Sequence, residues 1–392
     1  MYSRYLNLNL PQGQSAFLWG ARKTGKSTYL KMMYPDSVRF DLLNSSLELK
    51  FTKAPWQFRE EVLSLPKEKL LHPIIVDEIQ KVPAIMDEIH WLIENSEAYF
   101  ILCGSSVRKM RRRGVNMLGG RAIGYNFFPF VYPEIKDDFD LLLIFNHGLI
   151  PSHYTSPIAK RLLQSYINDY LSSEIKAESL TRNLAAFNRF LDSITFSHGE
   201  MINYSNIARD VGISADTVKE YYNILEDTLI GYLIYPYSKK ASRRIISFVP
   251  KFYLFDVGVA NRLIRNTING LQGAEAGRSL EHYIFLELYA YIHLNHLDHA
   301  IEYWRTHTGI EVDFIISDGH NPPIPVEVKI SSNVHVTDMK GLKIFMSEYG
   351  VKMGYMVSME NSIRTIDIDH GKIIIYPVRD FLDHLWSGDL VK

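Results

Sequence analysis

Gly20-Ala-Arg-Lys-Thr-Gly-Lys-Ser27 is the stretch that decides the fold of the first part of this chain. It matches the phosphate-binding pattern GxxxxGK[ST] at every fixed position. Ser15–Trp19 before it is typical of a short buried strand, and Ser27–Met33 after it is typical of the first turns of a helix. A strand, a glycine-rich turn and a helix in this order point backbone N–H groups and a positive helix end at a polyphosphate.

Each part of this loop has an expected chemical role. Gly20 and Gly25 leave space for the backbone to approach phosphate oxygens. Lys26 is expected to reach the β and γ phosphates, and Ser27 to ligate Mg²⁺. ATP and Mg²⁺ are therefore the expected cofactors. The other members of the predicted nucleotide-binding set are Ala21, Arg22, Lys23, Thr24 and Thr28.

The composition is that of an ordinary globular protein, with 46% hydrophobic and 22% charged residues. A length of 392 residues exceeds one ordinary core, so two or three domains are expected. The 43 basic and 44 acidic residues nearly cancel, so any nucleic-acid site must be a local patch. The single cysteine, Cys103, excludes an intrachain disulfide. No secretory signal or membrane span is indicated, so we expect a cytoplasmic protein with no membrane partner.

The pattern of apolar residues divides the chain into three parts. The first third alternates strand-like runs with helical patterns, which predicts an α/β fold with a mostly parallel sheet. From about Ser156 to Tyr235 the apolar spacing is helical, and two strand-like pieces follow, Ile245–Val249 and Phe252–Phe255. The last third is again mixed α/β and begins with a long helix from about Ala276 to Leu294. The other expected strands are Ala16–Trp19, Val38–Asp41, Pro73–Asp77, Ala98–Gly104, Ala300–Arg305, Val312–Ser317, Ile324–Ile330, Met353–Val357 and Ile373–Tyr376.

Two adjacent acids, Asp77 and Glu78, end the buried strand that begins at Pro73. Asp77 is expected to hold the water shell of the metal, and Glu78 to polarise the attacking water. With Lys26, Glu78 forms the predicted catalytic set for ATP hydrolysis. Adjacent acids also occur at solvated strand ends, but the complete phosphate loop upstream favours the catalytic interpretation.

Two further features follow the next strand. The Ser105 hydroxyl is predicted to lie between the acids and the γ-phosphate as a sensor, although a helix N-cap explains it equally well. Beyond the basic run Arg108–Arg113, Arg121 follows two glycines that allow close approach. Because its charge is permanent, an arginine suits the γ-phosphate of a neighbouring subunit, so Arg121 is the predicted finger of a homo-oligomer. The alternative for the basic run is a solvated face or a weak contact patch for a phosphate backbone.

These motifs in this order resemble a prokaryotic family of AAA-type ATPases that carry a C-terminal domain of uncharacterised function. The resemblance rests on the loop at Gly20–Thr28, Asp-Glu-Ile-Gln-Lys-Val-Pro83, Gly-Ser-Ser106, Gly-Gly-Arg121, Phe128-Pro-Phe130 with Glu134, and Phe252-Tyr-Leu-Phe-Asp-Val-Gly258. It covers nearly the whole chain and departs at Cys103, where the family usually has threonine. It implies that the first part is an AAA-type ATPase domain.

The helical middle contains a helix-turn-helix pattern at Tyr204–Tyr222. Ser205 and Ser214 are predicted N-caps, and Gly212 supplies the turn. The strand-like pieces that follow would form the wing of a winged helix, and the family resemblance agrees. A helical hairpin used only for packing is the alternative. The inward-facing residues are predicted to be Ile207, Ala208, Val218 and Tyr222.

Whether this element binds DNA depends on its charges. The second helix exposes Asp216 and Glu220 near its start, and two acids facing phosphates are unfavourable. Base-specific reading is therefore not favoured. The basic pairs Lys239-Lys240 and Arg243-Arg244 offer a contact to a DNA backbone through the wing.

Four charged residues in the last third share a predicted site. Glu327 and Lys329 fall on one face of a strand, and Asp313 lies on a neighbouring strand. Asp313 and Glu327 are expected to ligate Mg²⁺ at a phosphodiester, with Glu281 of the long helix completing the site. Lys329 would position the nucleophilic water. Glu327 and Lys329 are thus the predicted catalytic pair of a nuclease.

This arrangement resembles the PD-(D/E)xK restriction-endonuclease fold, with Asp313, Glu327 and Lys329 at its acid and ExK positions. Gly277 and Trp304-Arg305 also match the family. An acid and a lysine two residues apart occur on many exposed strands, so a surface salt-bridge ladder or an inactive nuclease fold is the alternative.

The sequence therefore predicts an AAA-type ATPase domain at residues 1–155, a winged-helix domain at 156–265 and a restriction-endonuclease-like α/β domain at 266–392. The first hypothesis is an ATPase whose nucleotide state controls a C-terminal region acting on nucleic acid, with DNA as the expected partner. The second is a nucleotide-gated interaction switch, in which an inactive nuclease-like domain docks protein partners.

Overall fold

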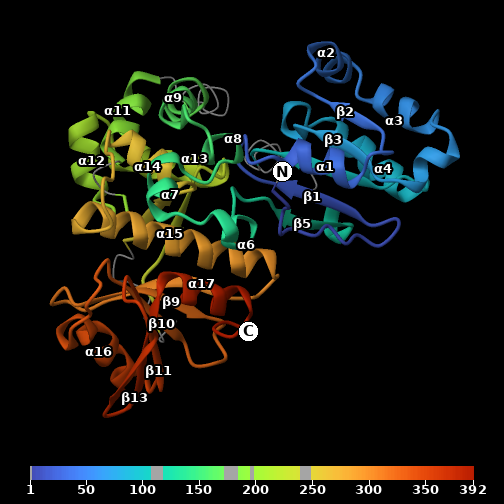
Figure 1. The fold of residues 1–392 in the computed structure, drawn as a ribbon. Helices are drawn as coiled ribbons and strands as arrows, with labels where there is room; N and C mark the ends of the chain where they lie inside the picture. Colours follow the sequence, from blue (N-terminus) through green and yellow to red (C-terminus); the bar gives the residue numbers. More distant parts are fainter. Residues whose placement is uncertain (1, 107–117, 172–183, 195–197, 239–248) are drawn as a thin grey trace. The chain divides into compact units, whose positions relative to one another are not determined.

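The structure, a computed structural model, describes residues 2–106, 118–171, 184–194, 198–238 and 249–392 (Figure 1). It separates into two compact units. The first comprises the chain up to Phe130 together with residues 223–230, and the second comprises the greater part of residues 131–392. The first unit ends before the predicted domain boundary at residue 155, and the division into three domains stays a prediction.

A five-stranded parallel sheet forms the centre of the first unit. Its strand order is β2-β3-β4-β1-β5, with β1 Ser15–Trp19, β2 Arg39–Asp41, β3 Ile74–Asp77, β4 Phe100–Gly104 and β5 Ala122–Asn126. Because all neighbours are parallel, the carboxyl ends of the strands share one edge, and β4 separates β1 from β3. The parallel α/β sheet is confirmed, although β5 was not among the predicted strands.

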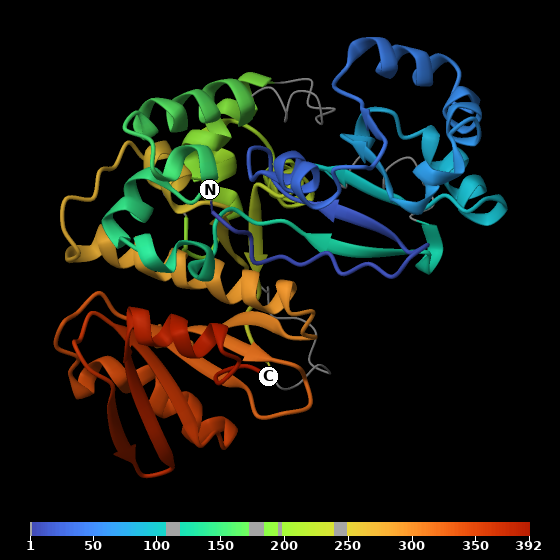
Figure 2. The same ribbon diagram turned by 45° about the vertical axis from the view of Figure 1, so that its right-hand side comes forward.

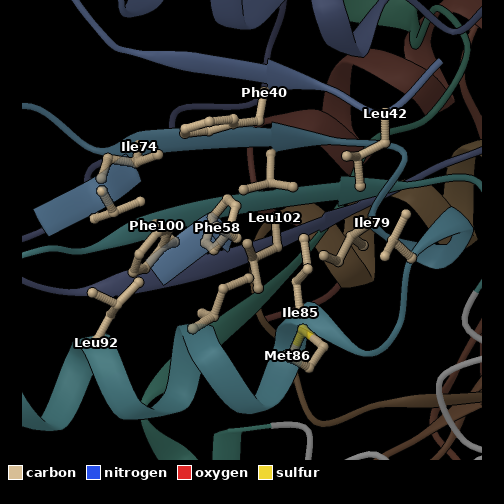
Figure 3. Packing of buried hydrophobic residues seen from close by; sticks show 14 of the residues in the cluster. Phe40, Leu42, Phe58, Ile74, Ile79, Ile85, Met86, Leu92, Phe100 and Leu102 are labelled. Carbon is tan, nitrogen blue, oxygen red and sulfur yellow. The ribbon is translucent and has the colours of Figure 1, made fainter. Parts of the chain in front are cut away.

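Apolar side chains between the sheet and its helices form the core of the first unit. In Figure 3, Ile85, Met86 and Leu92 of α4 point toward Phe100 and Leu102 of β4. All five are at most 1% exposed, and each such side chain contributes about 1.5–3 kcal/mol. The helices of this unit are α1 Lys26–Met33, α2 Ser45–Lys53, α3 Trp56–Leu63 and α4 Ile85–Asn95, with short 3₁₀ turns at Lys67–Leu71, Ile79–Lys81 and Leu118–Gly120.

The second unit begins with helices joined around a buried aspartate. Asp256 caps α14 by accepting from the Val259 N–H at 2.8 Å, and its other oxygen accepts from the Leu149 N–H at 2.6 Å. A Cβ on Gly258 would lie 2.2 Å from the Gly148 nitrogen, so glycine is required at this contact. Asp256 and Gly258 of the motif Asp256-Val-Gly258 thus have structural roles, one as a helix cap and one at a close backbone contact. The helices are α6 Tyr132–Ile135, α7 Leu141–His147, α8 Pro151–Tyr154, α9 Ala159–Ser165, a π-helix Tyr166–Leu171, α11 Leu184–Ile194 and α14 Val257–Leu263, with a 3₁₀ turn at Lys136–Asp138.

The helix-turn-helix pattern corresponds to α12 Tyr204–Val211 and α13 Ala215–Asp227. Gly212 is the left-handed C-cap of α12, and the Ser214 hydroxyl accepts from the Thr217 N–H, as predicted. The N-cap of α12 is Asn203 rather than Ser205, because the chain enters the helix two residues earlier and the Asn203 side chain accepts from the Asn206 N–H. The predicted inward residues Ile207, Ala208, Val218 and Tyr222 are buried.

Two strands pair antiparallel beside these helices, β6 Gly231–Ile234 and β7 Lys251–Leu254. The apolar spacing predicted helix for β6, but pairing with β7 makes it a strand. The basic pairs Lys239-Lys240 and Arg243-Arg244 lie outside the described residues, as do Ile245–Phe248 of the predicted wing. The winged-helix fold therefore stays a prediction.

A mixed six-stranded sheet forms the last part of the second unit, with the order β12-β13-β11-β10-β9-β8. Strands β8, β9 and β10 are antiparallel neighbours, whereas β10, β11 and β13 are parallel. The long predicted helix is α15 Gly273–Leu294, which packs against β10 and α17 (Figure 2). The remaining bounds are β8 Ala300–Arg305, β9 Glu311–Ser317, β10 Ile324–Val328, a 3₁₀ turn Val336–Met339, α16 Lys340–Tyr349, β11 Met353–Ser358, β12 Arg364–Ile368, β13 Gly371–Pro377 and α17 Val378–Trp386.

Within the described part of the chain, none of the helices has the length and apolar character that crossing a bilayer demands.

Candidate functional site

The predicted phosphate loop follows β1 at the carboxyl edge of the parallel sheet. The Gly20 N–H donates to the Gly104 carbonyl at 3.2 Å, which joins the start of the loop to the end of β4. A Cβ on Gly20 would lie 2.2 Å from the Phe127 carbonyl oxygen, and Gly25 has a φ of 100°. Both glycines are therefore required by backbone geometry. The loop turns directly into α1, which begins at Lys26.

Lys26 is 6% exposed and its ammonium lies inside this loop. It donates to the carbonyls of Gly20 at 2.6 Å and Ala21 at 2.9 Å. Burial lowers the pKa of Lys26, and the nearby carboxylates of Glu78 and Asp77 oppose that effect. Because the hydrogen bonds go to neutral carbonyls, the cation is held in place without being neutralised by direct contact.

Ser27 and Asp77 meet at this edge, although 50 residues separate them in the chain. The Ser27 hydroxyl donates to the Asp77 carboxylate at 2.6 Å. Asp77 ends β3 and Ser27 lies in the exposed first turn of α1. A hydroxyl and a carboxylate oxygen are ligands that Mg²⁺ accepts in proteins, so the donor set fits the predicted ion. The structure therefore brings together the two residues predicted to hold the metal.

Glu78 follows Asp77 in a left-handed conformation with a φ of 57° and is 7% exposed. Its Oε2 accepts from the amide of Gln80, lies 3.5 Å from the Ser105 hydroxyl and lies 3.9 Å from the Arg22 guanidinium. Because β4 lies between β1 and β3, Ser105 at the end of β4 reaches the acids, as the sensor prediction requires. The choice between a sensor and a helix N-cap for Ser105 stays a prediction.

The remaining predicted residues fall in two places. Thr24 is buried and donates from its hydroxyl to the Ala21 carbonyl at 2.8 Å, whereas Lys23 and Thr28 are exposed beside the loop. Arg121 lies apart from them, at the amino-terminal edge of the sheet before β5, where it pairs with Glu94. It is not part of the chain's own nucleotide site, and its role on a neighbouring subunit stays a prediction. The basic run Arg108–Arg113 lies outside the described residues.

Arg4 of the N-terminal segment, which no sequence motif predicts, holds the phosphate loop from outside. Its guanidinium donates to the Thr24 carbonyl at 2.7 Å and to the carbonyls of Phe128 at 2.7 Å and Pro129 at 3.2 Å. It also lies 4.2 Å from the ring centre of Phe127. Arg4 thereby ties the loop to the segment after β5. No motif pointed to it, because its partners are more than 120 residues away except for Thr24.

In the second unit, the predicted acids lie near one another. Asp313 is on β9, Glu327 is on β10, and Glu281 is on α15. Burial and the Asp313 carboxylate raise the pKa of both Glu281 and Glu327. Asp313 accepts from the Val328 N–H at 2.8 Å, and Lys329 pairs with Glu327 at 2.7 Å. One oxygen of Glu327 is buried and has no hydrogen-bond partner in the described part of the chain.

Lys251 of β7 is the residue that the sequence analysis missed in this acid cluster. Its side chain is 4% exposed, its ammonium pairs with Glu311, and it lies 3.7 Å from Glu281. Burial lowers its pKa, but the surrounding carboxylates more than offset this and raise it. Tyr253 also donates to Glu281 at 2.6 Å. Lysine and tyrosine partners thus hold acids that the sequence assigned to a metal.

This arrangement bears on the predicted Mg²⁺ set of Glu281, Asp313 and Glu327. Among the residues that the structure describes, no three His, Cys, Asp or Glu side chains are grouped as metal ligands. The acids are close enough to shift one another's pKa, but Glu281 is already paired with Lys251 and Glu327 with Lys329. The metal role of these acids stays a prediction.

Three family models match consecutive parts of the chain. Residues 12–136 match an AAA domain, residues 139–269 match the Domain of unknown function (DUF8612), and residues 276–381 match the Domain of unknown function (DUF4143). The first match agrees with the loop, the parallel sheet and the acids of β3. The first part of the chain is therefore an AAA-type, P-loop ATPase-like domain.

Comparison with whole proteins adds little to this. Uncharacterized proteins of Mycobacterium bovis and Mycobacterium tuberculosis are each 22% identical over 270 residues, which cover 67% of this chain and 60% of theirs. The chain thus spans about 60% of the length of these relatives. A solved structure of the Aeropyrum pernix ORC1 protein in complex with DNA is 12% identical, and the match covers 64% of this chain and 86% of that one. Its TM-score of 0.26 is too low to support an argument.

Proposed function

We propose that this chain is a Mg²⁺-dependent ATPase whose nucleotide state controls its C-terminal unit. The observation that carries the proposal is the hydrogen bond between Ser27 and Asp77 at the carboxyl edge of the parallel sheet. It joins the start of α1 to the end of β3, with Lys26 in the loop and Glu78 beside Asp77. Positioning and electrostatics are what phosphoryl transfer requires of a protein.

Each of these residues has a task in the proposed reaction. Ser27 and Asp77 would hold Mg²⁺, which offsets negative charge on the β and γ phosphate oxygens when it is bound. Lys26 exchanges its carbonyl partners for phosphate oxygens. Glu78 orients the attacking water and accepts a proton from it, while the water oxygen bonds to the γ phosphorus. The bond from that phosphorus to the bridging oxygen breaks, and ADP and phosphate are released.

Phosphate release and binding of a fluorescent ATP analogue test this proposal on the full chain. Lys26→Ala should abolish tight binding, and Glu78→Gln should bind ATP but hydrolyse it at least about 100-fold more slowly. Lys31→Ala is the matched control, because Lys31 is exposed on the same helix, α1. Wild-type turnover by Lys26→Ala would refute the assignment.

For the C-terminal unit, the first candidate is action on nucleic acid, including metal-dependent cleavage. The observation that favours it is the placement of Asp313, Glu327 and Lys329 together, with one buried Glu327 oxygen that has no hydrogen-bond partner among the described residues. A mixed sheet entered from a long helix is also compatible with the restriction-endonuclease resemblance. Cleavage of a panel of DNA and RNA substrates with Mg²⁺ or Mn²⁺ should disappear in Glu327→Ala. Mn²⁺ binding by the nucleotide-free protein, weakened in Asp313→Asn, is the readout that does not depend on activity.

The second candidate is a nucleotide-gated switch whose C-terminal unit docks protein partners. Lys251 favours it, because a buried lysine already compensates the acids that a metal would need. The exposed Asp216 and Glu220 at the start of α13 also disfavour phosphate contact. Size-exclusion chromatography with and without ATP, together with DNA titrations at several salt concentrations, separates the two candidates. A steep salt dependence supports DNA binding, and assembly with ATP but without DNA affinity supports the switch.

A further inference from the structure

Gln80 occupies a buried position next to the proposed hydrolytic acid. It lies in the 3₁₀ turn Ile79–Lys81 that follows Glu78, and it is 2% exposed. A buried side-chain amide is costly unless it forms hydrogen bonds, so its partners indicate why it is there. Its Nε2 donates to the Glu78 carboxylate and to the Ser105 hydroxyl, the latter at 3.0 Å.

The amide can face these two partners in only one way. With the group reversed, Gln80 Oε1 would oppose the Glu78 oxygen, and two acceptors repel each other. In the observed orientation, Oε1 is buried and has no hydrogen-bond partner among the described residues. The hydrogen bonds to Glu78 and Ser105 therefore determine the orientation of the amide, although its carbonyl oxygen then has no hydrogen bond among the described residues.

The end of β4 makes room for this side chain. A Cβ on Gly104 would lie 2.5 Å from Gln80 Oε1 and 2.6 Å from the Trp19 ring. Glycine directly before Ser105 thus allows Gln80 to reach across from β3 to β4. A glutamine placed only for packing would not require this space and two polar partners at the proposed site.

We propose that Gln80 is a positioning residue for ATP hydrolysis, which fixes the Glu78 carboxylate and links it to the hydroxyl of Ser105. The Arg22 guanidinium, 3.9 Å from the same Glu78 oxygen, approaches that carboxylate from the phosphate loop. The two hydrogen bonds of the Gln80 amide go to Glu78 and Ser105, and not to Lys26 or to the Ser27–Asp77 pair. Removing its amide should therefore impair the chemical step and leave nucleotide binding intact. The inference rests on the proposed ATPase function.

Gln80→Met removes both hydrogen bonds at similar volume, and Gln80→Glu keeps the shape but places a second carboxylate beside Glu78. In the full chain, Gln80→Met should bind a fluorescent ATP analogue within about 2-fold of wild type and lose about 10-fold or more in single-turnover hydrolysis. Gln80→Glu has no amide donor for Glu78, so it should also bind the analogue within about 2-fold of wild type and lose about 10-fold or more in single-turnover hydrolysis. Gln57→Met, on helix α3, is the matched control.

The outcomes separate the inference from the function it rests on. If Glu78→Gln abolishes hydrolysis while Gln80→Met hydrolyses at the wild-type rate, the positioning role is wrong and the ATPase proposal stands. Parallel loss of binding and rate in Gln80→Met would also overturn the role, because it indicates a structural residue. If Gln80→Met does not fold, the same comparison of binding and single-turnover rate in the isosteric Gln80→Glu decides alone.

Discussion

Replacing Glu287 with glutamine should remove the part of the pH dependence of unfolding of the second unit that this carboxyl group contributes. Glu287 is on α15 and is 1% exposed. Its two oxygens accept from the Tyr132 N–H at 3.0 and 3.1 Å, and Oε2 also accepts from the Trp386 indole N–H at 2.8 Å. These bonds join the first helix of the unit, α6, to its last, α17, through one buried carboxylate.

The size of the effect follows from the shifted ionisation. Burial raises the pKa of Glu287 from the ordinary 4.5 to about 7, while the hydrogen bonds from Tyr132 and Trp386 oppose the rise. The folded state then binds more protons than the unfolded state, so stability is greatest at acid pH and falls as pH rises from 4.5 through 7. Between pH 5 and pH 8 this one group removes about 2.5 kcal/mol of unfolding free energy.

Urea unfolding at pH 5, 6, 7 and 8, followed by tryptophan fluorescence and circular dichroism, measures this. Between pH 5 and pH 8 the unfolding free energy of Glu287→Gln should fall by about 2.5 kcal/mol less than that of the wild type. Glu275→Gln, an exposed change on the same helix, should leave the slope nearly unchanged. A Glu287→Gln variant that keeps the wild-type pH slope would refute the reasoning.

Three further substitutions test close contacts. Gly258→Ala places a methyl group 2.2 Å from the Gly148 nitrogen, so urea unfolding should show the second unit destabilised by about 3 kcal/mol or more. Gly20→Ala places a methyl group 2.2 Å from the Phe127 carbonyl oxygen, so the affinity of the chain for an ATP analogue should fall at least about 10-fold. Arg4→Lys loses the forked hydrogen bonds behind the loop, and the KM for ATP should rise about 3-fold or more with a smaller change in kcat.

Two glycines on open surface serve as controls for these changes. A Cβ on Gly124 of β5 or on Gly270 meets nothing within 4 Å, and neither residue has a positive φ. Gly124→Ala should leave ATP affinity unchanged, and Gly270→Ala should leave the unfolding of the second unit unchanged. If Gly124→Ala lowers ATP affinity as much as Gly20→Ala, or Gly270→Ala lowers the unfolding free energy as much as Gly258→Ala, the effects do not come from the close contacts.

The fold was predictable where apolar runs are long and bounded by turns. The strands β1, β3 and β4 lie within a residue or two of their expected bounds. Strand β5 was missed because Ala122–Asn126 is only partly buried and contains a glycine. Strand β6 was assigned to a helical pattern, since only its pairing with β7 makes it extended. Local sequence pattern does not contain such a long-range pairing.

The candidate site was predictable to the extent that a contiguous motif defines it. The loop, Asp77 and Glu78 follow from motif and strand ends, and Ser105 follows from the expectation that strand ends share an edge. Arg4 and Lys251 could not be predicted in this way, because their partners are distant in the chain and no sequence motif links them to those partners. Side chains that brace a site from another element become visible only when the elements are packed together.

The buried lysines Lys26 and Lys251 differ in the charge of their hydrogen-bond and ion-pair partners. Lys26 donates to neutral carbonyls and burial lowers its pKa, whereas Lys251 is paired with carboxylates that raise its pKa. A buried cation without a direct counter-ion is costly, and an incoming polyanion relieves that cost. A buried cation among carboxylates has no such need, and a polyanion approaching it would meet repulsion from Glu281 and Glu311. Lys26 therefore lies where an external anion would balance its charge, whereas the charge of Lys251 is already balanced by carboxylates of its own unit.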